Sequence, residues 1–369
     1  MNESELVLYR KYRPRDFDAI VGQAHVVGPL TNALRLGKVA HAYLFSGPRG
    51  VGKTTIARLI AKALNCTGKM PPCNTCSACS DFNIGRAMDL IEIDAASNRG
   101  IDEVRELREG VRYIPAQGKF KTYVIDECHM LTRDAFNALL KTLEEPPGHA
   151  VFVLATTELE KVPATIVSRT QHYDFRRPAV AEISNRLTEI AEKEGVKLEA
   201  DGAHLIARAA EGSFRDAESI LGQIMAVEEK KITRPGVESI LGLPRREAAQ
   251  QMFGFIAEKN AHDALALVQE LHDSGYDLSY FTKLLMQYFR NALILKIDMS
   301  LKKFVAEELL ADELECIVAR LPSWSAQDLS RGLHIIFQNM QQFRRTPIPQ
   351  LPLEITVIEL INGKIEPPV

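Results

Sequence analysis

The sequence lacks an apolar run of the roughly 18 residues needed to cross a bilayer. Its first residues, Met1 to Glu5, are polar and acidic, so we expect no secretory signal. It has little net charge: 45 basic and 48 acidic residues leave −3, so any contact with nucleic acid needs a local basic patch. It contains no repeat of fixed period and no low-complexity tail. We therefore expect a cytoplasmic globular protein of two or three domains in 369 residues.

Cysteine is sparse, and most of it lies in one stretch. Four of the six cysteines follow each other at spacings of six, two and two residues: Cys66, Cys73, Cys76 and Cys79. Four thiolates are the number that a closed structural zinc site requires. A redox pair or an iron–sulfur cluster would use the same residue type and stays open as an alternative. The isolated Cys128 and Cys316 are expected to be buried as small apolar side chains.

The most informative motif is a glycine-rich run that fits G-x-x-x-x-G-K-[ST]. Its residues are Gly47, Pro48, Arg49, Gly50, Val51, Gly52, Lys53 and Thr54. A short apolar strand, 42–46, precedes it, and a helical pattern, 55–64, follows it. In this context the glycines let backbone N–H groups face a phosphate, Lys53 reaches the β- and γ-phosphates, and Thr54 ligates Mg²⁺. The chain has no Asn-Lys-x-Asp motif of the kind that GTP-binding families use to read guanine; because a P-loop itself does not distinguish ATP from GTP, it is this comparison between families that favours ATP.

The first half alternates apolar strands with helices, which predicts a parallel sheet with helices on both faces. The expected strands are 42–46, 89–94, 121–126, 151–156 and 171–175. From Arg176 to about Gly242 only helical patterns occur, at 180–194, 200–211 and 215–227. Beyond Gly242 the expected helices are 246–258, 261–274, 279–297, 304–320 and 325–342. We therefore expect an α/β domain at 1–178 with a zinc module at 66–79, a small helical lid at 179–243 and an all-α domain at 244–369.

Polar residues follow the predicted strands where catalytic groups are expected. Asp126 suits Mg²⁺ binding, and Glu127 suits polarising the attacking water. His129 is interpreted as a helix-start or linker residue. Thr157 follows the next strand, and it either senses a γ-phosphate or caps the next helix. Arg169 and Arg215 are candidates for phosphate contacts, although their spacing alone does not choose between that role and an ordinary surface charge.

These pieces together resemble the AAA+ clamp-loader ATPases. The resemblance rests on the P-loop, Asp126-Glu127 and the segments 9–14, 21–23, 137–147, 155–157 and 168–169. The four-cysteine module after the P-loop helix resembles, more particularly, the tau/gamma family of bacterial DNA polymerase III clamp loaders. The motif-bearing part is about 9–242, and the remainder matches only as a helical collar of suitable length.

The resemblance implies roles for individual residues. The adenine and ribose would lie near Arg10, Tyr12, Arg13, Pro14 and Val21, and the phosphates would lie against 47–55, which includes Thr55. Thr157 would sense the γ-phosphate. Arg215 would contact the chain's own nucleotide, and Arg169 would reach a neighbouring subunit's ATP as an arginine finger. The family usually has Ser-Arg-Cys at that place, whereas this chain has Thr170 after the arginine.

The resemblance also implies partners and a mechanism. ATP binding would close a pentamer of this chain with delta and delta′ subunits, open the sliding clamp and admit primer–template DNA; hydrolysis would release the loader. Candidate DNA contacts are Arg99, Arg105 and Lys141, each of which is equally consistent with ordinary surface charge. Two other functions remain open at this point: a replication scaffold that binds nucleotide without hydrolysing it, and a DNA-translocating AAA+ motor.

Overall fold

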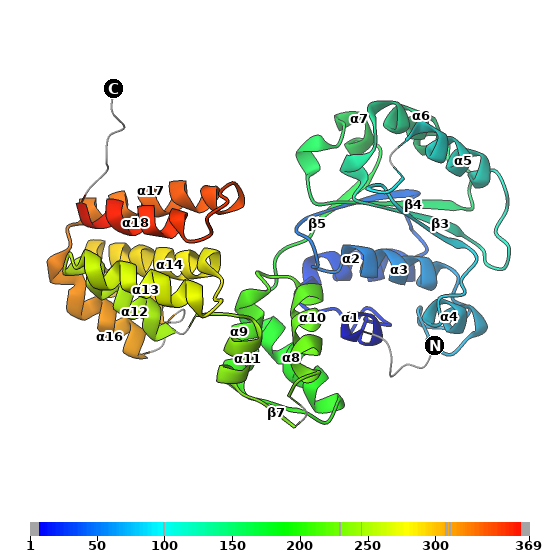
Figure 1. Ribbon diagram of the computed structural model, residues 1–369. Helices are drawn as coiled ribbons and strands as arrows, with labels where there is room; N and C mark the ends of the chain where they lie inside the picture. The colour runs from blue at the N-terminus through cyan, green and yellow to red at the C-terminus, as the bar shows by residue number, and fades with distance from the viewer. Residues whose placement is uncertain are drawn as a thin grey trace. The chain divides into compact units, whose positions relative to one another are not determined.

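The computed structural model describes residues 7–98, 100–228, 230–244, 246–306, 309 and 311–362. The chain forms two compact units, Met1–Arg234 and Pro235–Val369, and each is described by itself. The first contains the sheet and the helices that follow it, and the second is helical (Figure 1). In the described residues, no helix is both long enough and apolar enough to span a membrane.

A five-stranded parallel sheet is the centre of the first unit. Its strands, in the spatial order β2-β3-β4-β1-β5, are β2 Leu90–Asp94, β3 Lys121–Asp126, β4 Ala150–Thr156, β1 Ala42–Ser46 and β5 Gln171–Asp174. The register aligns the strand ends, because Ser46 pairs with Thr156 and Asp94 pairs with Asp126. The carboxyl ends of the strands therefore meet at one edge of the sheet.

Helices cover both faces of this sheet (Figure 1). One face carries α2 Ala24–Arg35 and α3 Lys53–Leu64, and the other carries α5 Ile101–Val111, α6 Arg133–Glu144 and α7 Ala164–Val167. Alternate strand residues belong to separate cores: Tyr123 and Ile125 pack in one, and Val124 packs in the other. This confirms the doubly wound parallel sheet that the buried apolar strands predict.

Three helices follow the sheet, namely α8 Val180–Lys193, α9 Ala200–Ala209 and α10 Phe214–Met225. The structure adds two short strands to this lid, β6 Lys197–Leu198 and β7 Lys231–Ile232, which pair in parallel. The expectation of helices alone was wrong here, because a two-residue strand is too short to carry a periodic signal. The shorter elements of the unit are α1 Leu8–Lys11, α4 Ser77–Asn83, η2 Cys128–Met130 and η3 Leu159–Lys161.

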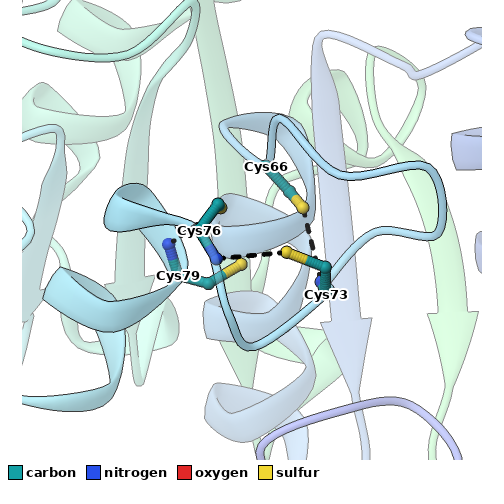
Figure 2. A group of neighbouring side chains, drawn as sticks. All are labelled: Cys66, Cys73, Cys76 and Cys79. Atoms are coloured by element: carbon teal, nitrogen blue, oxygen red, sulfur yellow. Dashed lines mark hydrogen bonds between the residues drawn. The ribbon is translucent and has the colours of Figure 1, made fainter.

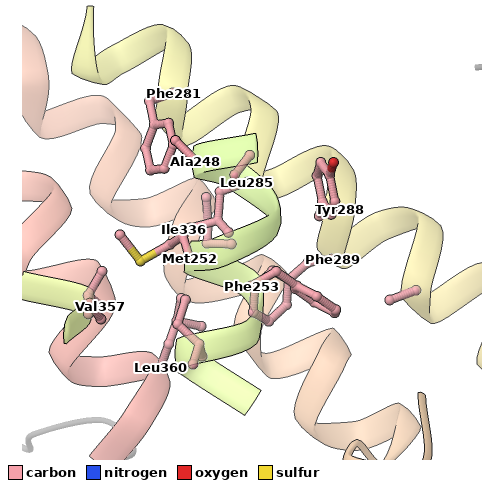
Figure 3. Close-up of a cluster of buried hydrophobic side chains, with 14 of the residues drawn as sticks. Ala248, Met252, Phe253, Phe281, Leu285, Tyr288, Phe289, Ile336, Val357 and Leu360 are labelled. Carbon is pink, nitrogen blue, oxygen red and sulfur yellow. The ribbon is translucent and has the colours of Figure 1, made fainter. Parts of the chain in front are cut away.

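The second unit is an all-α domain around an aromatic core (Figure 3). After α11 Arg234–Ile240, which crosses the unit boundary, its main helices are α12 Arg246–Ala257, α13 Ala261–Asp273, α14 Leu278–Ile297, α16 Ala311–Arg320, α17 Ala326–Met340 and α18 Leu351–Asn362. Short segments join them: α15 Lys302–Ala306, η4 Met299–Leu301, η5 Leu321–Ser323 and η6 Gln341–Arg344. Phe253 packs edge-to-face on Phe289 at a centroid distance of 5.3 Å, and Trp324 contacts both rings.

Two details of this domain differ from the sequence prediction. The single helix expected at 304–320 is two helices, α15 and α16. Val305 and Leu314 are both buried but lie nine residues apart, so one continuous helix would put them about 180° apart on its surface. A break lets both face the core. Helix α18 was not expected, because Pro352 lies in its first turn, where proline is tolerated but reads as a stop signal.

Candidate functional site

The loop between β1 and α3 faces the carboxyl edge of the sheet with its backbone. Gly47, Gly50 and Gly52 have positive φ angles of 135°, 75° and 104°. A Cβ on Gly47 would lie 2.3 Å from a neighbouring backbone carbonyl oxygen, so only glycine fits there. Helix α3 begins at Lys53, and its N-terminal N–H groups add partial positive charge at the loop. This arrangement suits the binding of a phosphate.

Lys53 is held inside this loop. Its side chain is 5% exposed, and its Nζ donates to the carbonyl oxygens of Gly47 and Pro48 at 2.7 Å each. Burial lowers the pKa of Lys53, and the charges of Glu127 and Asp126 oppose that shift. The ammonium group therefore lies beside the loop backbone, where it can exchange carbonyl contacts for phosphate oxygens.

The end of β3 meets the start of α3 at a hydrogen bond. Thr54 Oγ1 donates to Asp126 Oδ2 at 2.7 Å, which brings a hydroxyl and a carboxylate together across 72 residues of sequence. Hard oxygen donors of this kind are the ligands that Mg²⁺ prefers. The pair predicted to bind Mg²⁺ therefore has the right donor chemistry and lies at one point of the site.

Glu127 and Thr157 form the adjoining part of the site. Thr157 Oγ1 donates to Glu127 Oε2 at 2.9 Å, and the main chain of Glu127 is left-handed, with φ 48° and ψ 44°. Such a conformation is uncommon for a residue with a Cβ, and in folded proteins it is maintained by the surrounding contacts. The conformation turns the chain sharply after β3.

A cavity of about 550 Å³ connects these groups with the N-terminal segment and the lid. The residues expected from the sequence that line it are Arg13, Pro14, Val21, Arg49, Gly50, Val51, Gly52, Lys53, Thr54, Thr55, Asp126, Glu127 and Arg215. Further lining comes from Tyr9, Ala19, Ile20, Asp94, Ala96, Arg186, Phe214 and Glu218. The volume and the mixture of apolar and charged lining suit a nucleotide-sized ligand.

The lid contacts the P-loop directly. The N–H of Phe214, at the start of α10, donates to the carbonyl oxygen of Gly50 at 3.0 Å. A Cβ on Gly50 would lie 1.9 Å from Ser213 Oγ, so the glycine also makes this close approach possible. Arg215 lies in the first turn of α10, and its guanidinium is 4.9 Å from the ring centroid of Tyr9. The loop, the lid and the N-terminal segment therefore meet at the cavity.

The N-terminal segment is fastened to lid helix α8. Arg186 donates to the carbonyl oxygen of Tyr12 at 2.5 Å, and the Tyr12 hydroxyl donates to Glu194, which also pairs with Lys11. Tyr12 therefore contacts the lid rather than the cavity lining. Arg10 is exposed, and its guanidinium lies 5.8 Å from the Tyr9 ring centroid. Of the residues expected near the base, Arg13, Pro14 and Val21 line the cavity.

Glu218 is an unexpected acid in the cavity wall. It is 7% exposed, and its Oε1 lies 3.5 Å from Nε of Arg186. Burial raises the pKa of Glu218 to about 7, even though the charge of Arg186 lowers it. It lies three residues after Arg215 and so on the same face of α10. That spacing was a signal in the sequence, whereas nothing there indicated Arg186.

Arg169 lies just after α7, outside the cavity lining. Its Nη2 pairs with Glu144 at 2.8 Å, and its Nη1 donates to the carbonyl oxygen of Thr165 at 2.9 Å. Of the three candidate DNA contacts, Arg105 is exposed on α5 and pairs with Asp102, and Lys141 is exposed on α6. Helices α5 and α6 pack side by side on one face of the sheet (Figure 1). Arg99 lies outside the described residues.

The four clustered cysteines form a compact group where the chain leaves α3 and enters α4, with Cys76 as the N-cap of α4 and Cys79 in its first turn (Figure 2). All four Sγ atoms lie within 4.8 Å of one another, close to the ~3.8 Å edge of a tetrahedron with Zn–S bonds of ~2.3 Å. The N–H groups of Gly68 and Cys73 both donate to Cys66 Sγ at 3.3 Å. A hydrogen bond from Thr75 helps to lower the pKa of Cys73 to about 5, while burial raises that of Cys79 to about 12. The group fits a four-thiolate metal site.

The buried Lys62 joins this group to the rest of the unit. It is 4% exposed on α3, and its Nζ donates to the carbonyl oxygen of Arg15 at 2.8 Å and to Asn83 at 2.6 Å. It also donates to Asn74, which lies between two of the cysteines. The P-loop helix, the N-terminal segment and the cysteine group therefore share one ammonium. Of the two other cysteines, Cys128 is buried as expected and Cys316 is half-buried.

A P-loop, strand-end acids on a parallel sheet and a helical lid define the AAA+ class of nucleotide-binding proteins. Three family profiles cover most of the chain: DNA polymerase III, delta subunit, at 22–179; DNA polymerase III clamp loader subunit, ATPase lid domain, at 182–229; and DNA polymerase III subunits gamma and tau domain III at 232–368.

Curated relatives agree with these profiles. The chain is 39% identical to DNA polymerase III subunit tau of Bacillus subtilis over 96% of its own length, and it spans 62% of that relative. It is 46% identical to subunit tau of Escherichia coli over 73% of its length, spanning 42% of that relative. It is 33% identical to subunit gamma of Buchnera aphidicola over 98% of both chains. The chain belongs to the gamma/tau family of DNA polymerase III clamp-loader subunits.

Metal content tests the cysteine group. The full chain, purified without chelator, should contain about one Zn²⁺ per chain, because four thiolates close the coordination of the ion. Replacing Cys73 and Cys76 by Ser should reduce zinc well below that level, whereas Cys316→Ser should leave it unchanged. Zinc and iron are measured by elemental analysis. Iron in place of zinc, or zinc that is equal in both variants, would contradict the assignment.

The pH dependence of stability tests Glu218. Because its folded-state pKa is raised, the folded chain binds a proton between about pH 4.5 and 7 that the unfolded chain has released, so this group's stability contribution is lost as pH rises through 7. The shift corresponds to at most about 3 kcal/mol. Glu218→Gln should therefore raise the melting temperature, relative to the native chain, by several degrees more at pH 8 than at pH 5. Glu192→Gln, at an exposed position on α8, is the control; an equal difference for Glu218→Gln at both pH values would refute the expectation.

Proposed function

We propose that this chain is an ATP-hydrolysing motor subunit of the DNA polymerase III clamp loader. The observation that carries the proposal is that Thr54 and Asp126, which are hydrogen-bonded to each other, line a nucleotide-sized cavity with Lys53 and Glu127, and that Glu127 accepts the Thr157 hydroxyl. Family membership supports the clamp-loader assignment, and the geometry supports hydrolysis over binding alone. The proposed domains are 1–178 for nucleotide binding, 179–243 for the lid and 244–369 for the collar.

Each residue of the proposed site has a separate role in binding or hydrolysing ATP. The loop 47–55 and the ammonium of Lys53 hold the phosphates of ATP, and Thr54 and Asp126 hold Mg²⁺, which neutralises phosphate charge when bound. Glu127 accepts a hydrogen bond from the attacking water, which orients the water, and then accepts its proton. Thr157 is proposed to sense the γ-phosphate through its hydrogen bond to Glu127. Arg215 contributes positive charge from the lid.

The proposed partners are those of a clamp loader. Further copies of this chain and delta and delta′ subunits complete a pentamer at the replication fork. ATP binding drives opening of the sliding clamp and binding of primer–template DNA, with Arg105, Lys141 and Arg99 as candidate phosphate contacts. Hydrolysis then releases the clamp on DNA. Arg169 is proposed to act on the ATP of a neighbouring subunit, and its position outside the chain's own cavity lining agrees with that role.

Loss of the P-loop lysine tests the proposal. In a complex reconstituted with cognate partners, Lys53→Ala should lower DNA-stimulated ATP hydrolysis at least about 100-fold, since charge-assisted hydrogen bonds to phosphate are lost. Clamp loading on primed DNA should fall with it. Lys38→Ala, at an exposed position before β1, is the matched control. Loading by the Lys53 variant at the native rate would refute the proposal. Loading that needs nucleotide but no hydrolysis would favour the scaffold, and strand displacement without loading would favour the translocating motor.

The proposed action of Arg169 in a neighbouring site has its own test. Arg169→Ala should reduce the turnover of the assembled complex by a factor of about 10³–10⁵, the range for arginine fingers, without weakening ATP binding by the isolated chain. Hydrolysis is measured by phosphate release, and binding by a fluorescent ATP analogue. Arg133→Ala, exposed at the start of α6, is the control. An equal loss of binding in the isolated chain would contradict action on a neighbour.

A further inference from the structure

His129 lies directly behind the proposed base. It is the middle residue of η2, which follows Glu127, and its side chain is 6% exposed. Its Nδ1 lies 3.0 Å from Thr156 Oγ1 and 3.4 Å from Glu127 Oε2. Its Nε2 lies 3.2 Å from Glu158 Oε1. One buried imidazole therefore contacts the residue after β3, the last residue of β4 and the loop that follows β4.

The hydrogen bonds around the ring determine its orientation. The N–H of Glu158 donates to Thr156 Oγ1 at 3.0 Å, which leaves the Thr156 hydroxyl free to donate its proton to Nδ1. The other ring nitrogen, Nε2, lies 3.2 Å from the Glu158 carboxylate, close enough for an ion-pair contact. The Glu158 carboxylate also pairs with Lys161 at 2.7 Å, and this second contact keeps the carboxylate in place. The imidazole is thus held on both sides.

Glu127 depends on its neighbours for the direction of its carboxylate. Its left-handed main chain turns the backbone away from the course of β3. Of its two carboxylate oxygens, Oε2 accepts the Thr157 hydroxyl on one side and faces the edge of His129 on the other. A base must hold its oxygen within about 0.5 Å of the productive position to be effective. The imidazole therefore limits how far the carboxylate can turn.

We propose that His129 is a positioning residue for Glu127 and that it links this carboxylate, through Glu158, to the segment carrying Arg169. This inference rests on the proposed hydrolytic function. From Glu158 the chain continues through η3 and α7 to Arg169 within eleven residues. Movement of the Glu158 loop and rotation of the Glu127 carboxylate are coupled at the ring. His129 thus contacts both the proposed base, Glu127, and Glu158, which begins the segment that carries the proposed arginine finger, Arg169.

The test uses the full chain in its reconstituted complex and three replacements of His129. His129→Leu fills the space without polar contacts and should lower kcat about 10–100-fold, as small displacements of a catalytic group do, while KM changes less than about twofold. His129→Asn places an amide near Nδ1 and should recover kcat to within about fivefold of native. His129→Gln places an amide near Nε2 and should recover less. The control is His149→Leu, which removes another half-buried imidazole of the unit, one that contacts the Val111 carbonyl oxygen; it should keep native kcat.

The link to Glu158 is tested by a double-mutant cycle. Glu158→Gln alone should lower kcat, and in the His129→Leu background it should have no further effect, since the contact it would break is already absent. Independent effects of the two changes would overturn the link. Native kcat in His129→Leu would overturn the positioning role, as would an Asn variant no better than Leu. Where the native complex hydrolyses ATP and the Lys53→Ala complex does not, these contradicting results for the His129 and Glu158 variants reject this inference alone. A native complex that does not hydrolyse ATP would reject the proposed function, and this inference with it.

Discussion

The parallel register of β3, β4 and β1 is the constraint on which the candidate site depends. These strands lie side by side, and their carboxyl ends meet at one edge. The P-loop follows β1. Asp126 is the last residue of β3 and Glu127 follows it, and Thr156 is the last residue of β4 and Thr157 follows it. Asp126, Glu127 and Thr157 lie at or just after strand ends, and the P-loop brings Thr54, at the start of α3, to the same edge. The hydrogen bond from Thr54 to Asp126 and that from Thr157 to Glu127 therefore depend on the sheet. A chain of the same motifs without this strand order would not assemble them.

Local sequence was enough to predict the parts of the site that are contiguous. The P-loop, the acids after β3 and the cysteine spacing each carry their chemistry within a few residues, so their backbone context could be inferred. The residues that the sequence did not indicate are held by contacts between distant segments. Arg186 reaches the carbonyl of Tyr12 across 174 residues, and no pattern within α8 distinguishes it from a surface arginine. The interpretation of His129 as a helix-start or linker residue missed its contacts, because its partners Thr156 and Glu158 lie on a different strand and loop.

The lid is joined to the nucleotide-binding part by specific polar contacts. The backbone hydrogen bond from Phe214 to Gly50 joins α10 to the P-loop itself, while Arg186 and Glu194 fasten the N-terminal segment to α8. Of the residues that make these contacts, Gly50, Phe214 and Arg186 line the cavity. A ligand in the cavity would therefore touch the loop, the lid and the N-terminal segment at once. It would favour the arrangement of these three parts in which its contacts are strongest. That is a physical basis on which a ligand in the cavity would move the lid.

The surroundings of Arg169 bear on its proposed role in a neighbouring site. Its guanidinium is kept in one orientation by Glu144, by Ser168 and by the carbonyl oxygen of Thr165. The ion pair with Glu144 is partly exposed, with 35% and 47% of the two side chains accessible, and such pairs contribute only about 0–1 kcal/mol. Exchanging Glu144 for a phosphate oxygen would therefore cost little, and the new contact would be charge-assisted and frequently bidentate. A weakly paired but oriented arginine suits a group that must leave its own subunit's carboxylate when another subunit presents ATP.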